Sequence, residues 1–472
     1  MIVHAVRTGA LVVIKIFNHY LHRRTLMGVA FDIGLLNLAL MAVVLAQVES
    51  IRMVMPLAGP QVVSLAAGVF VINTASGLYQ QSERRSAREY CARAALALML
   101  SLPLAYLVFS FMPAGSVNRE ALQLSAMLGI SAVIVRRVYV SHWDRQSDKG
   151  SRILIFGTGP AAQLVGKTLT EADPLTKIVG YLQGPNEKDP VISAQHLVTS
   201  SLSLYDTACQ LEVDEIVVAL TERRAGSMPL RELLDCKVRG IRVFDISTHF
   251  ERTLGQIRVD YVNAGWLIFG DGFNQGFYRA AVKRAFDLLC TLLLTIVASP
   301  LMLFTALAIK LESRGDVFYW QERVGANNQV FKIAKFRSMA SDAEKDGKPV
   351  WAATNDSRVT RIGQIIRRLR IDELPQLLNV LRGDMSLVGP RPERPFFVDQ
   401  LTQEIPYYAL RHSVKPGVTG WAQVRYQYGS TVEDSQEKLQ YDLYYIKNHT
   451  LFLDIIILLE TIGVVLTGKG AR

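Results

Sequence analysis

The sequence is poor in cysteine and lacks the pairings that cysteine-based sites need. It has four cysteines in 472 residues, and they form no CxxC pair: Cys91, Cys209, Cys236 and Cys290. This pattern argues against a zinc ribbon or a disulfide framework and favours reduced thiols in a cytosol-facing protein. The chain also has no zinc-ligand spacing, no aromatic RNA-binding motif and no long Lys/Arg tail, so nucleic acid is not an expected partner.

The N-terminus does not have the pattern of a cleavable signal peptide. Arg7 and Lys15 interrupt its apolar stretch, and His22-Arg23-Arg24 follow it where a small-residue cleavage site would belong. We therefore expect residues 1–28 to form an N-terminal cytoplasmic segment.

The composition is both apolar and basic. Half of the residues are hydrophobic and the formal net charge is +10, while the mean hydropathy is +0.20. A length of 472 residues exceeds one ordinary domain. Together these features predict a multidomain membrane protein that meets an anionic lipid surface, a phosphorylated substrate, or both.

Four apolar stretches come first, each near the length that a helix needs to cross a bilayer, although the last is short. They are Phe31–Val48, Leu57–Leu78, Ala94–Met112 and Ala121–Val135. Arginines gather on the outer flanks and in the central connection, whereas the other two connections hold only Arg52 and Arg119. The positive-inside rule thus predicts a transmembrane block over residues 29–140 with both ends in the cytoplasm. Asp32 and Glu49 lie near expected helix ends, where a charge costs little, so the block reads as an anchor rather than a channel.

Residues 150–247 alternate between β-branched strands and helical stretches, which predicts a Rossmann-like α/β domain followed by a linker at 248–278. The turn Gly157–Ala162 has the pattern GxGxxA, which suits a diphosphate at a helix N-terminus. However, no acid ends the next strand to hold a ribose, and Pro160 removes a donor N–H. A structural or regulatory domain is favoured over the alternative, a membrane-anchored nucleotide-sugar oxidoreductase or dehydratase that binds NAD.

The uncharged run Leu288–Ile309 has 22 residues, enough for a fifth spanning helix. Basic residues flank it on both sides: Lys283, Arg284, Lys310 and Arg314. Ser299 and Pro300 fall at its middle, where proline kinks a helix and the serine hydroxyl can bond the freed carbonyl. These features favour a re-entrant helix that enters and leaves on one face, over a straight span with a tolerated kink. The acidic apolar segment Leu451–Leu466 is expected to be an interfacial or packed helix.

The stretch that follows is dense in basic residues. Residues 318–339 alternate like a β-hairpin around the turn Gly325–Asn328. The hairpin presents Arg323, Lys332, Lys335 and Arg337. After it, an amphipathic helix is expected to place four apolar side chains on one face: Ile362, Ile365, Ile366 and Leu369.

Two adjacent acids, Asp372 and Glu373, precede Pro375 at the expected start of a helix that ends at Gly383. Acids at a helix N-terminus beside arginines are expected to stay ionised. An ionised carboxylate suits a nucleophile or a metal ligand, so one acid is expected to attack phosphorus and the other to hold Mg²⁺. The alternative is that both acids only cap the helix.

Several motifs in order resemble the bacterial sugar transferase family, which comprises monotopic polyprenyl-phosphate sugar-1-phosphate transferases. They are "VKRAFDLLCTLLLTIVASPLMLFTALAIKL", "KFRSM", "RRLRIDELPQLLNVLRGDMSLVGPRPE" and "KPGVTGWAQV". The layout resembles the large members that initiate exopolysaccharide or O-antigen synthesis. The resemblance implies a fold of three parts: a membrane α-helical bundle, the α/β Rossmann-like domain, and an α+β monotopic phosphoglycosyl transferase domain over residues 279–472 with a re-entrant membrane helix.

The resemblance also implies roles for individual residues. Asp372 matches the nucleophile that displaces UMP from a UDP-sugar, and Glu373 matches the acid that ligates Mg²⁺. Basic residues match positions near the phosphates: Arg370, Arg391, Lys335, Arg337 and, on the hairpin, Arg323. Ser299 and Pro300 match the kink of the re-entrant helix, whose basic, headgroup-facing start matches Lys283 and Arg284. Arg370-Ile371 departs from the family, which often has Ser or Thr-Leu there.

The partners that the resemblance implies are a UDP-sugar, undecaprenyl phosphate and inner-membrane lipid, and the architecture is compatible with a homodimer. The expected reaction gives undecaprenyl-diphosphate-sugar, with a hexose such as glucose or galactose, as the first membrane step of exopolysaccharide synthesis. The expected location is the bacterial inner membrane, multi-pass, with the catalytic domain on the cytoplasmic face.

Overall fold

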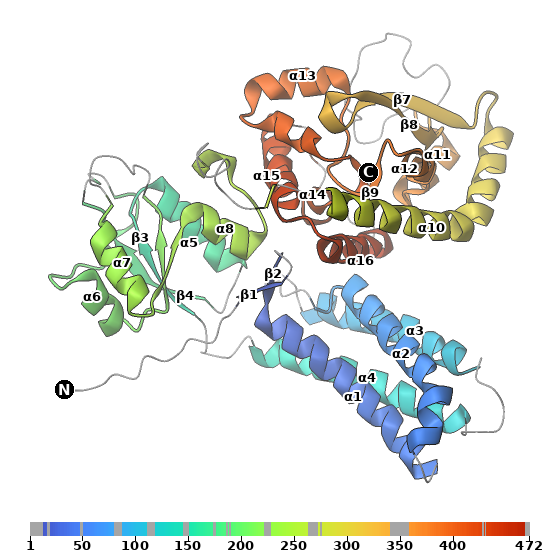
Figure 1. The fold of residues 1–472 in the computed structure, drawn as a ribbon, viewed down its shortest axis with the longest axis horizontal. Helices are drawn as coiled ribbons and strands as arrows, with labels where there is room; N and C mark the ends of the chain where they lie inside the picture. Colours follow the sequence, from blue (N-terminus) through green and yellow to red (C-terminus); the bar gives the residue numbers. More distant parts are fainter. Residues whose placement is uncertain are drawn as a thin grey trace. The chain divides into compact units, whose positions relative to one another are not determined.

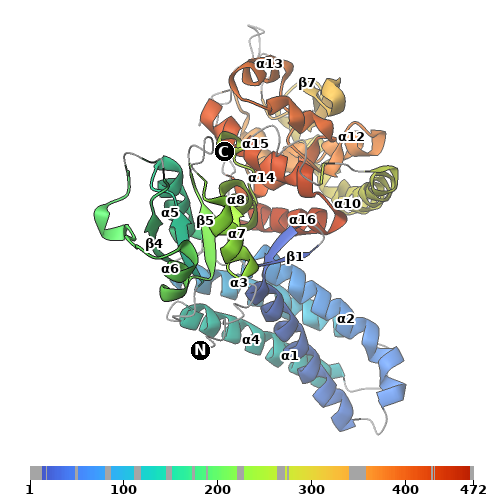
Figure 2. The same cartoon turned by 60° about the vertical axis from the view of Figure 1, so that its left-hand side comes forward.

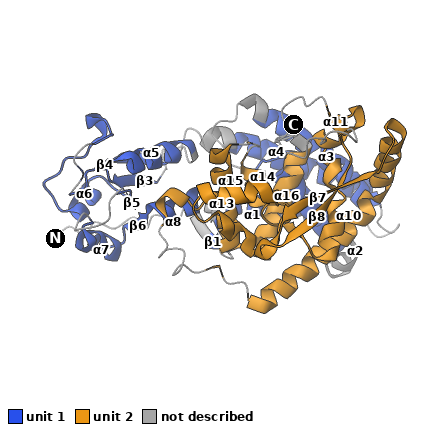
Figure 3. Cartoon of the chain, turned by 90° about the horizontal axis from the view of Figure 1, so that it is seen from above, with its two compact units in different colours: residues 1–16, 20–255 blue, residues 17–19, 256–472 orange. Residues whose placement is uncertain are grey.

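The computed structural model divides the chain into two compact units, residues 1–16 with 20–255 and residues 17–19 with 256–472 (Figure 3). The residues it describes are 13–16, 19–47, 51–79, 87–110, 119–144, 151–172, 176–185, 187, 190–220, 228–262, 272–273, 276–339, 358–426, 429 and 431–467. A short pair of strands, β1 (Val13–Ile16) and β2 (His19–His22), precedes the first helix.

Long apolar helices form the first part of the larger unit (Figure 1). They are α1 (Arg23–Gln47), α2 (Ile51–Ala75), α3 (Ala87–Ser110) and α4 (Arg119–Asp144). Segments of α1, α3 and α4 are long and apolar enough to cross a membrane, and α2 holds a shorter apolar segment, Pro60–Ala75. The described residues of the four predicted apolar stretches are therefore helical, apart from a turn at 76–78.

The sequence suggested that Asp32 lies near a helix end, where a charge costs little free energy. In the structure Asp32 lies inside α1. Its side chain is 3% exposed and forms ion pairs with Arg136 and Arg137 of α4. Gly28, one turn earlier, leaves room for the Arg137 guanidinium, since an added Cβ would lie 2.7 Å from Nη2. A buried carboxylate needs such partners because an uncompensated charge is costly inside a bundle.

The second part of this unit is a parallel four-stranded sheet with the order β4-β3-β5-β6. Its strands are β3 (Arg152–Phe156), β4 (Lys177–Leu182), β5 (Glu215–Val218) and β6 (Arg242–Asp245). The helices around it are α5 (Pro160–Ala172), α6 (Leu204–Gln210), α7 (Leu230–Val238) and α8 (Ile246–Leu254), and Figure 2 shows several of them on the sheet's faces. The strands and helices alternate as the sequence predicted, and the strands form a parallel sheet.

The glycine turn of this sheet is filled by the chain itself. Gly157 has φ +136°, and an added Cβ would lie 2.6 Å from the Ala219 carbonyl oxygen. The backbone N–H of Thr158 and that of Gly184 donate to one oxygen of Glu187, at 2.7 and 3.1 Å. A carboxylate therefore lies at the glycine turn and takes one N–H donor that a phosphate could use in a dinucleotide-binding turn.

In the other unit, α10 (Gly276–Glu312) is one helix of 37 residues with Pro300 inside it. It changes direction part-way along its length (Figure 1). Pro300 has no N–H for the Ile296 carbonyl, and the Ser299 hydroxyl donates to that carbonyl at 2.8 Å, as the sequence predicted. In the most apolar segment of α10 only 11% of the helix is buried against the rest of the protein. Side chains such as Val297 and Phe304 are 78% and 71% exposed.

A compact α+β body surrounds the base of α10. Its elements are β7 (Phe318–Val324), β8 (Val330–Phe336), α11 (Arg361–Arg368), the 3₁₀ helix η4 (Ile371–Glu373), α12 (Gln376–Arg382), β9 (Ser386–Val388), α13 (Pro395–Glu404), the 3₁₀ helix η5 (Tyr408–Ser413), β10 (Gly417–Thr419), α14 (Trp421–Arg425), α15 (Val432–Asn448) and α16 (Leu451–Thr467). β7 and β8 form the predicted antiparallel hairpin, and β9 and β10 pair in parallel. The C-terminal helix α16 is packed, since Leu453 and Ile457 are fully buried in the core.

Only part of the predicted apolar face of α11 packs against the body. Ile366 is buried with Ile309 and Phe336, and Ile362 lies against them. Ile365 and Leu369 are 58% and 51% exposed. The amphipathic helix is therefore confirmed, but its four apolar residues divide into a packed pair and an exposed pair.

Candidate active site

The two adjacent acids lie on a sharp turn between two helices. α11 ends beside Arg370, a non-glycine residue with φ +57°, and η4 begins directly after it. Arg370 thus adopts the left-handed conformation that usually costs a side chain free energy. Pro375 caps α12, which ends at Gly383 with φ +97° as predicted. This turn leaves Asp372 and Glu373 buried, each 8% exposed.

Glu373 is surrounded by cations. Arg391 approaches its Oε1 at 2.6 Å, Arg370 at 3.6 Å and Lys335 at 3.7 Å. Burial alone would raise the pKa of Glu373, but these three charges outweigh burial and hold its pKa well below the usual range. Glu373 is therefore an ionised carboxylate with committed partners.

Asp372 has a different environment. Its Oδ1 is buried and has no hydrogen-bond partner among the residues that the structure describes. Burial and the adjacent charge of Glu373 raise the pKa of Asp372 to about 6, against the opposing charges of Lys335 and the nearby arginines. With a pKa of about 6 Asp372 is still mostly ionised near neutral pH, so the ionised state of both acids stays a prediction, and burial opposes it at Asp372.

Lys335 extends from β8 toward the same pair. Burial lowers the pKa of Lys335 to about 8, although the Glu373 carboxylate opposes this shift. Asn379 of α12 joins this strand to the helix after the acids: its Oδ1 accepts from Ala334 N at 2.9 Å and its Nδ2 donates to Lys332 O at 2.8 Å. The hairpin and the acid turn are therefore fixed to each other.

Arg391 belongs to the loop Gly389–Glu393, which follows β9. Gly389 N donates to Thr419 O at 2.9 Å, so the loop begins where the β9–β10 pair ends. Glycine is required at this point because an added Cβ would lie 2.4 Å from the Lys415 carbonyl oxygen. The structure thus brings Asp372, Glu373 and Arg391 together with Lys335 and Arg370.

Two of the predicted phosphate-contacting residues have other partners. Arg337 donates to Ser313 O at 2.9 Å and to Arg314 O at 3.2 Å, so its guanidinium caps the C-terminal end of α10. Arg323 donates to Gln321 Oε1 at 2.6 Å and to Pro392 O at 3.0 Å. Arg323 therefore supports the Arg391 loop, whereas Arg337 supports α10.

The basic start of α10 contacts other elements of the same unit. Lys283 lies 2.9 Å from Oδ2 of the fully buried Asp454 on α16. Arg284 donates to the carbonyls of Val380 and Leu381 at 2.6 and 3.0 Å, at the C-terminal end of α12. These contacts attach α10 to the body that carries the acids, and the headgroup-facing role of Lys283 and Arg284 stays a prediction.

Sequence reasoning missed the buried polar residues that support the site, chiefly Asn379 and Arg411. Asn379 of α12 is 0% exposed. A polar residue on an expected core face was the sequence signal that could have revealed its supporting role. Arg411 is 6% exposed and donates to the Arg391 carbonyl at 2.9 Å. Nothing in the local sequence distinguishes Arg411 from a surface arginine.

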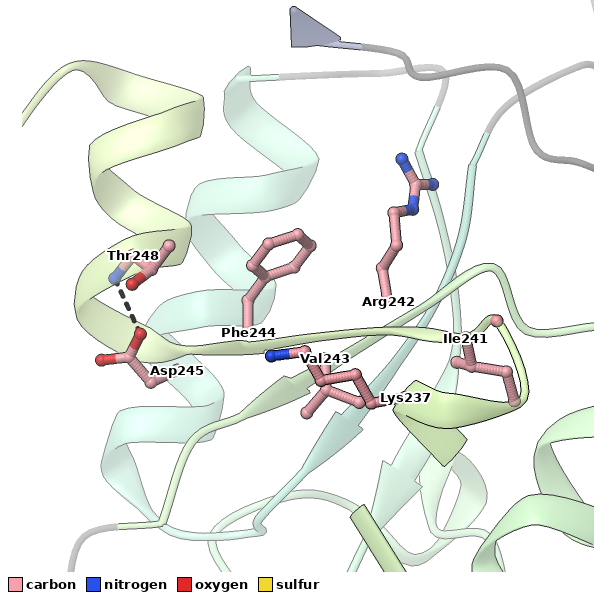
Figure 4. A pocket seen from close by; sticks show the side chains of 8 residues that line it. Lys237, Ile241, Arg242, Val243, Phe244, Asp245 and Thr248 are labelled. Carbon is pink, nitrogen blue, oxygen red and sulfur yellow. Dashed lines mark hydrogen bonds between the residues drawn. The ribbon is translucent and has the colours of Figure 1, made fainter. Parts of the chain in front are cut away.

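A groove of about 470 Å³ lies away from these residues, in the other unit. It follows β6 at the edge of the parallel sheet (Figure 4), and its polar lining includes Lys237, Arg242 and Asp245. Asp245 accepts from the Thr248 N–H at 3.2 Å and so caps α8. None of the predicted site residues lines this groove.

Comparison with known proteins identifies relatives of the part that holds the site. The profile of the bacterial sugar transferase family matches residues 278–468. Over 259 residues the chain is 45% identical to a UDP-N-acetylgalactosamine-undecaprenyl-phosphate N-acetylgalactosaminephosphotransferase of Aeromonas hydrophila, an alignment covering 55% of this chain and 60% of that protein.

Two further relatives are named for glucose transfer. The chain is 49% identical over 185 residues to an undecaprenyl-phosphate glucose phosphotransferase of Komagataeibacter xylinus, covering 38% of this chain and 35% of that protein. It is 46% identical over 192 residues to a UDP-glucose:undecaprenyl-phosphate glucose-1-phosphate transferase of Caulobacter vibrioides, covering 40% of this chain and 71% of that protein. The chain thus spans less than two thirds of the first two relatives.

Proposed function

Because this chain belongs to the bacterial sugar transferase family, we propose that it transfers a sugar 1-phosphate from a UDP-sugar to undecaprenyl phosphate and releases UMP. The relatives' names support this reaction, and we place it at the first membrane step of polysaccharide synthesis. One observation carries the proposal: a buried carboxylate oxygen of Asp372 has no hydrogen-bond partner among the described residues, directly beside a cation cluster around Glu373.

The chain's residues divide the reaction into two displacements. An oxygen of Asp372 attacks the phosphorus that bears the sugar, the bond to UMP breaks, and an aspartyl-phosphosugar forms. The phosphate oxygen of undecaprenyl phosphate then attacks the same phosphorus, and the Asp372 carboxylate leaves. Arg391, Arg370 and Lys335 offset the negative charge that develops on the phosphate oxygens.

The residues also suit a Mg²⁺ ion that arrives with the diphosphate. Among the described residues no group of three or more His, Cys, Asp or Glu side chains forms a closed metal cage. Mg²⁺ ordinarily uses one or two carboxylates together with substrate phosphates and water. Glu373 would supply such a carboxylate and leave the unpartnered oxygen of Asp372 for the attack, and the ion would neutralise charge on the diphosphate when bound.

The membrane helices support a location at the bacterial inner membrane with the site on the cytoplasmic face. α10 combines an exposed apolar surface with a central Ser299-Pro300 pair. Lys283 and Arg284 hold one end of α10 to the body, and Arg337 holds the other end. Both ends of α10 therefore belong on the same side, which favours the re-entrant arrangement over a span.

We assign the Rossmann-like part of the chain no catalytic role. Glu187 already accepts from the Thr158 N–H of its glycine turn and from the Gly184 N–H after β4. This self-contact argues against the alternative of an NAD-dependent oxidoreductase or dehydratase, because a dinucleotide would have to displace a carboxylate.

The proposal is tested with the full chain in nanodiscs, Mg²⁺, undecaprenyl phosphate and a panel of UDP-glucose, UDP-galactose and UDP-N-acetylgalactosamine. The expected result is release of UMP with one of these donors. Release of UDP would instead identify an ordinary glycosyltransferase, and no nucleotide release with any donor would contradict the proposal.

A further inference from the structure

The loop that carries Arg391 is held almost entirely through its carbonyl groups. Pro390 and Pro392 have no N–H, so the backbone around Arg391 has few donors to offer. Four consecutive carbonyls accept hydrogen bonds instead. The donors are Gly417 N to Pro390 O at 2.9 Å, Arg411 Nη2 to Arg391 O at 2.9 Å, Arg323 Nη1 to Pro392 O at 3.0 Å and Val324 N to Glu393 O at 2.9 Å.

Arg411 is the donor that acts on Arg391 itself. Its guanidinium is 6% exposed and also contacts the Tyr408 hydroxyl. The same Nη2 lies 2.9 Å from Oδ2 of Asp442 on α15, a carboxylate that is 1% exposed. A buried guanidinium with one buried counter-charge is held in a single orientation, because any rotation would leave one of the two charges unpaired.

These contacts form a chain that leads to the reacting pair. Asp442 orients Arg411, Arg411 holds the Arg391 carbonyl, and the Arg391 guanidinium lies 2.6 Å from Glu373. Asp442 and Arg411 come from α15 and η5, so two elements outside the acid turn set the position of Arg391.

We propose that the buried Arg411–Asp442 pair is a positioning pair, which fixes Arg391 at the distance from Glu373 that the donor's phosphate requires. The inference rests on the proposed function only for its kinetic test. Independently of the reaction, we expect loop 389–393 to become less ordered when Arg411 is replaced.

The kinetic test is a double-mutant cycle between Arg411→Lys and Arg391→Lys, read as kcat/KM for UMP release. A lysine at 411 cannot reach Asp442 and the Arg391 carbonyl with a planar fork, so kcat/KM should fall about 10- to 100-fold. In the double variant the loss should equal that of Arg391→Lys alone within about 2-fold, since Arg411 acts through Arg391. If the loss in the double variant equals the product of the two single losses, the proposal is overturned and Arg411 has only a general structural role.

Two further variants separate positioning from folding. Asp442→Asn keeps the Arg411 donor but removes its counter-charge, and should lower kcat/KM in the same direction by a smaller factor. Tyr444→Phe removes a buried hydroxyl on α15, the helix that carries Asp442; this hydroxyl contacts His19, and kcat/KM should change by less than about 3-fold. A loss in Tyr444→Phe equal to that in Arg411→Lys would contradict the specific chain from Asp442 to Arg391.

Hydrogen–deuterium exchange of the peptide that contains residues 386–394 needs no turnover and so does not depend on the proposed function. Arg411→Lys and Asp442→Asn should speed exchange there relative to the unmodified chain, while Tyr444→Phe should not. If the unmodified chain releases no UMP, the proposed function fails but this measurement still decides the positioning role. Unchanged exchange in Arg411→Lys would overturn it.

Discussion

Nη2 of Arg391 lies 2.6 Å from Oε1 of Glu373, and this contact joins the loop after β9 to the turn that carries both acids. The two residues are 18 positions apart and belong to separate elements. This contact places the Arg391 guanidinium beside the acids, where its charge can offset that of an incoming diphosphate.

Replacing Arg391 with lysine should weaken the site without unfolding it. Lysine retains the charge but loses the planar fork, so we expect kcat/KM for UMP release to fall about 10- to 100-fold. Arg337→Lys is the matched control, because Arg337 donates to carbonyls at the end of α10. Equal losses in both variants would show that the Arg391–Glu373 contact has no special role.

The membrane arrangement of α10 predicts that both of its ends face the cytoplasm. Phe277 and Leu311 are 91% and 86% exposed, so each can carry a single cysteine in a background without the native cysteines. Neither Phe277→Cys nor Leu311→Cys should react with a membrane-impermeant maleimide in intact cells, and both should react after permeabilisation. Labelling at position 311 alone in intact cells would indicate a straight span.

Buried histidines predict that the body around the site loses stability in mild acid. Burial lowers the pKa of His19 to about 3 and that of His412 to about 4. Between pH 4 and 6.5 these two histidines then bind more protons in the unfolded chain than in the folded chain, so their contribution to stability is fully present above pH 6.5 and is lost as the pH falls toward 4. In His412→Gln the decline of Tm over this range should be shallower, whereas the exposed-site control His196→Gln should follow the unmodified chain. Parallel Tm curves for all three proteins would contradict the burial argument.

Removing the Asn379 side chain should lower the free energy of unfolding strongly, although Asn379 takes no part in the reaction. Asn379→Ala would leave Ala334 N–H and Lys332 C=O without their side-chain partner in the interior, at a cost of roughly 2–4 kcal/mol in the free energy of unfolding. Gln364→Ala, at an exposed position of α11, should change this free energy by less than about 0.5 kcal/mol. Pulse proteolysis measures both, and a similar small effect for the two variants would remove Asn379 from the supporting framework.

The sequence predicted those features that depend on local patterns. The β7–β8 hairpin follows from alternation around a glycine turn, and α12 follows from Pro375 and Gly383 at its ends. Pro300 and the Ser299 hydroxyl behave as their types require in any helix. The adjacency of the acids in sequence was enough to place Asp372 and Glu373 together.

What the sequence did not predict depends on tertiary partners. Lys283 and Arg337 are basic residues near a membrane helix, yet their contacts are with Asp454 and with carbonyls of α10, which no local pattern reveals. The raised pKa of Asp372 arises from burial, which is decided by the packing of the whole domain. Arg411 meets Asp442 only because η5 and α15 pack together.

The most direct test of the account is to trap the covalent intermediate. The full chain is incubated with Mg²⁺ and UDP-glucose or UDP-N-acetylgalactosamine labelled with ³²P on the sugar-bearing phosphate, without undecaprenyl phosphate, then quenched and digested. The account predicts label retained on the peptide that contains Asp372, lost on addition of undecaprenyl phosphate, and absent in Asp372→Asn, whose turnover should fall at least ~10³-fold. UMP release with no label retained on that peptide, or an Asp372→Asn variant that turns over normally, would contradict it.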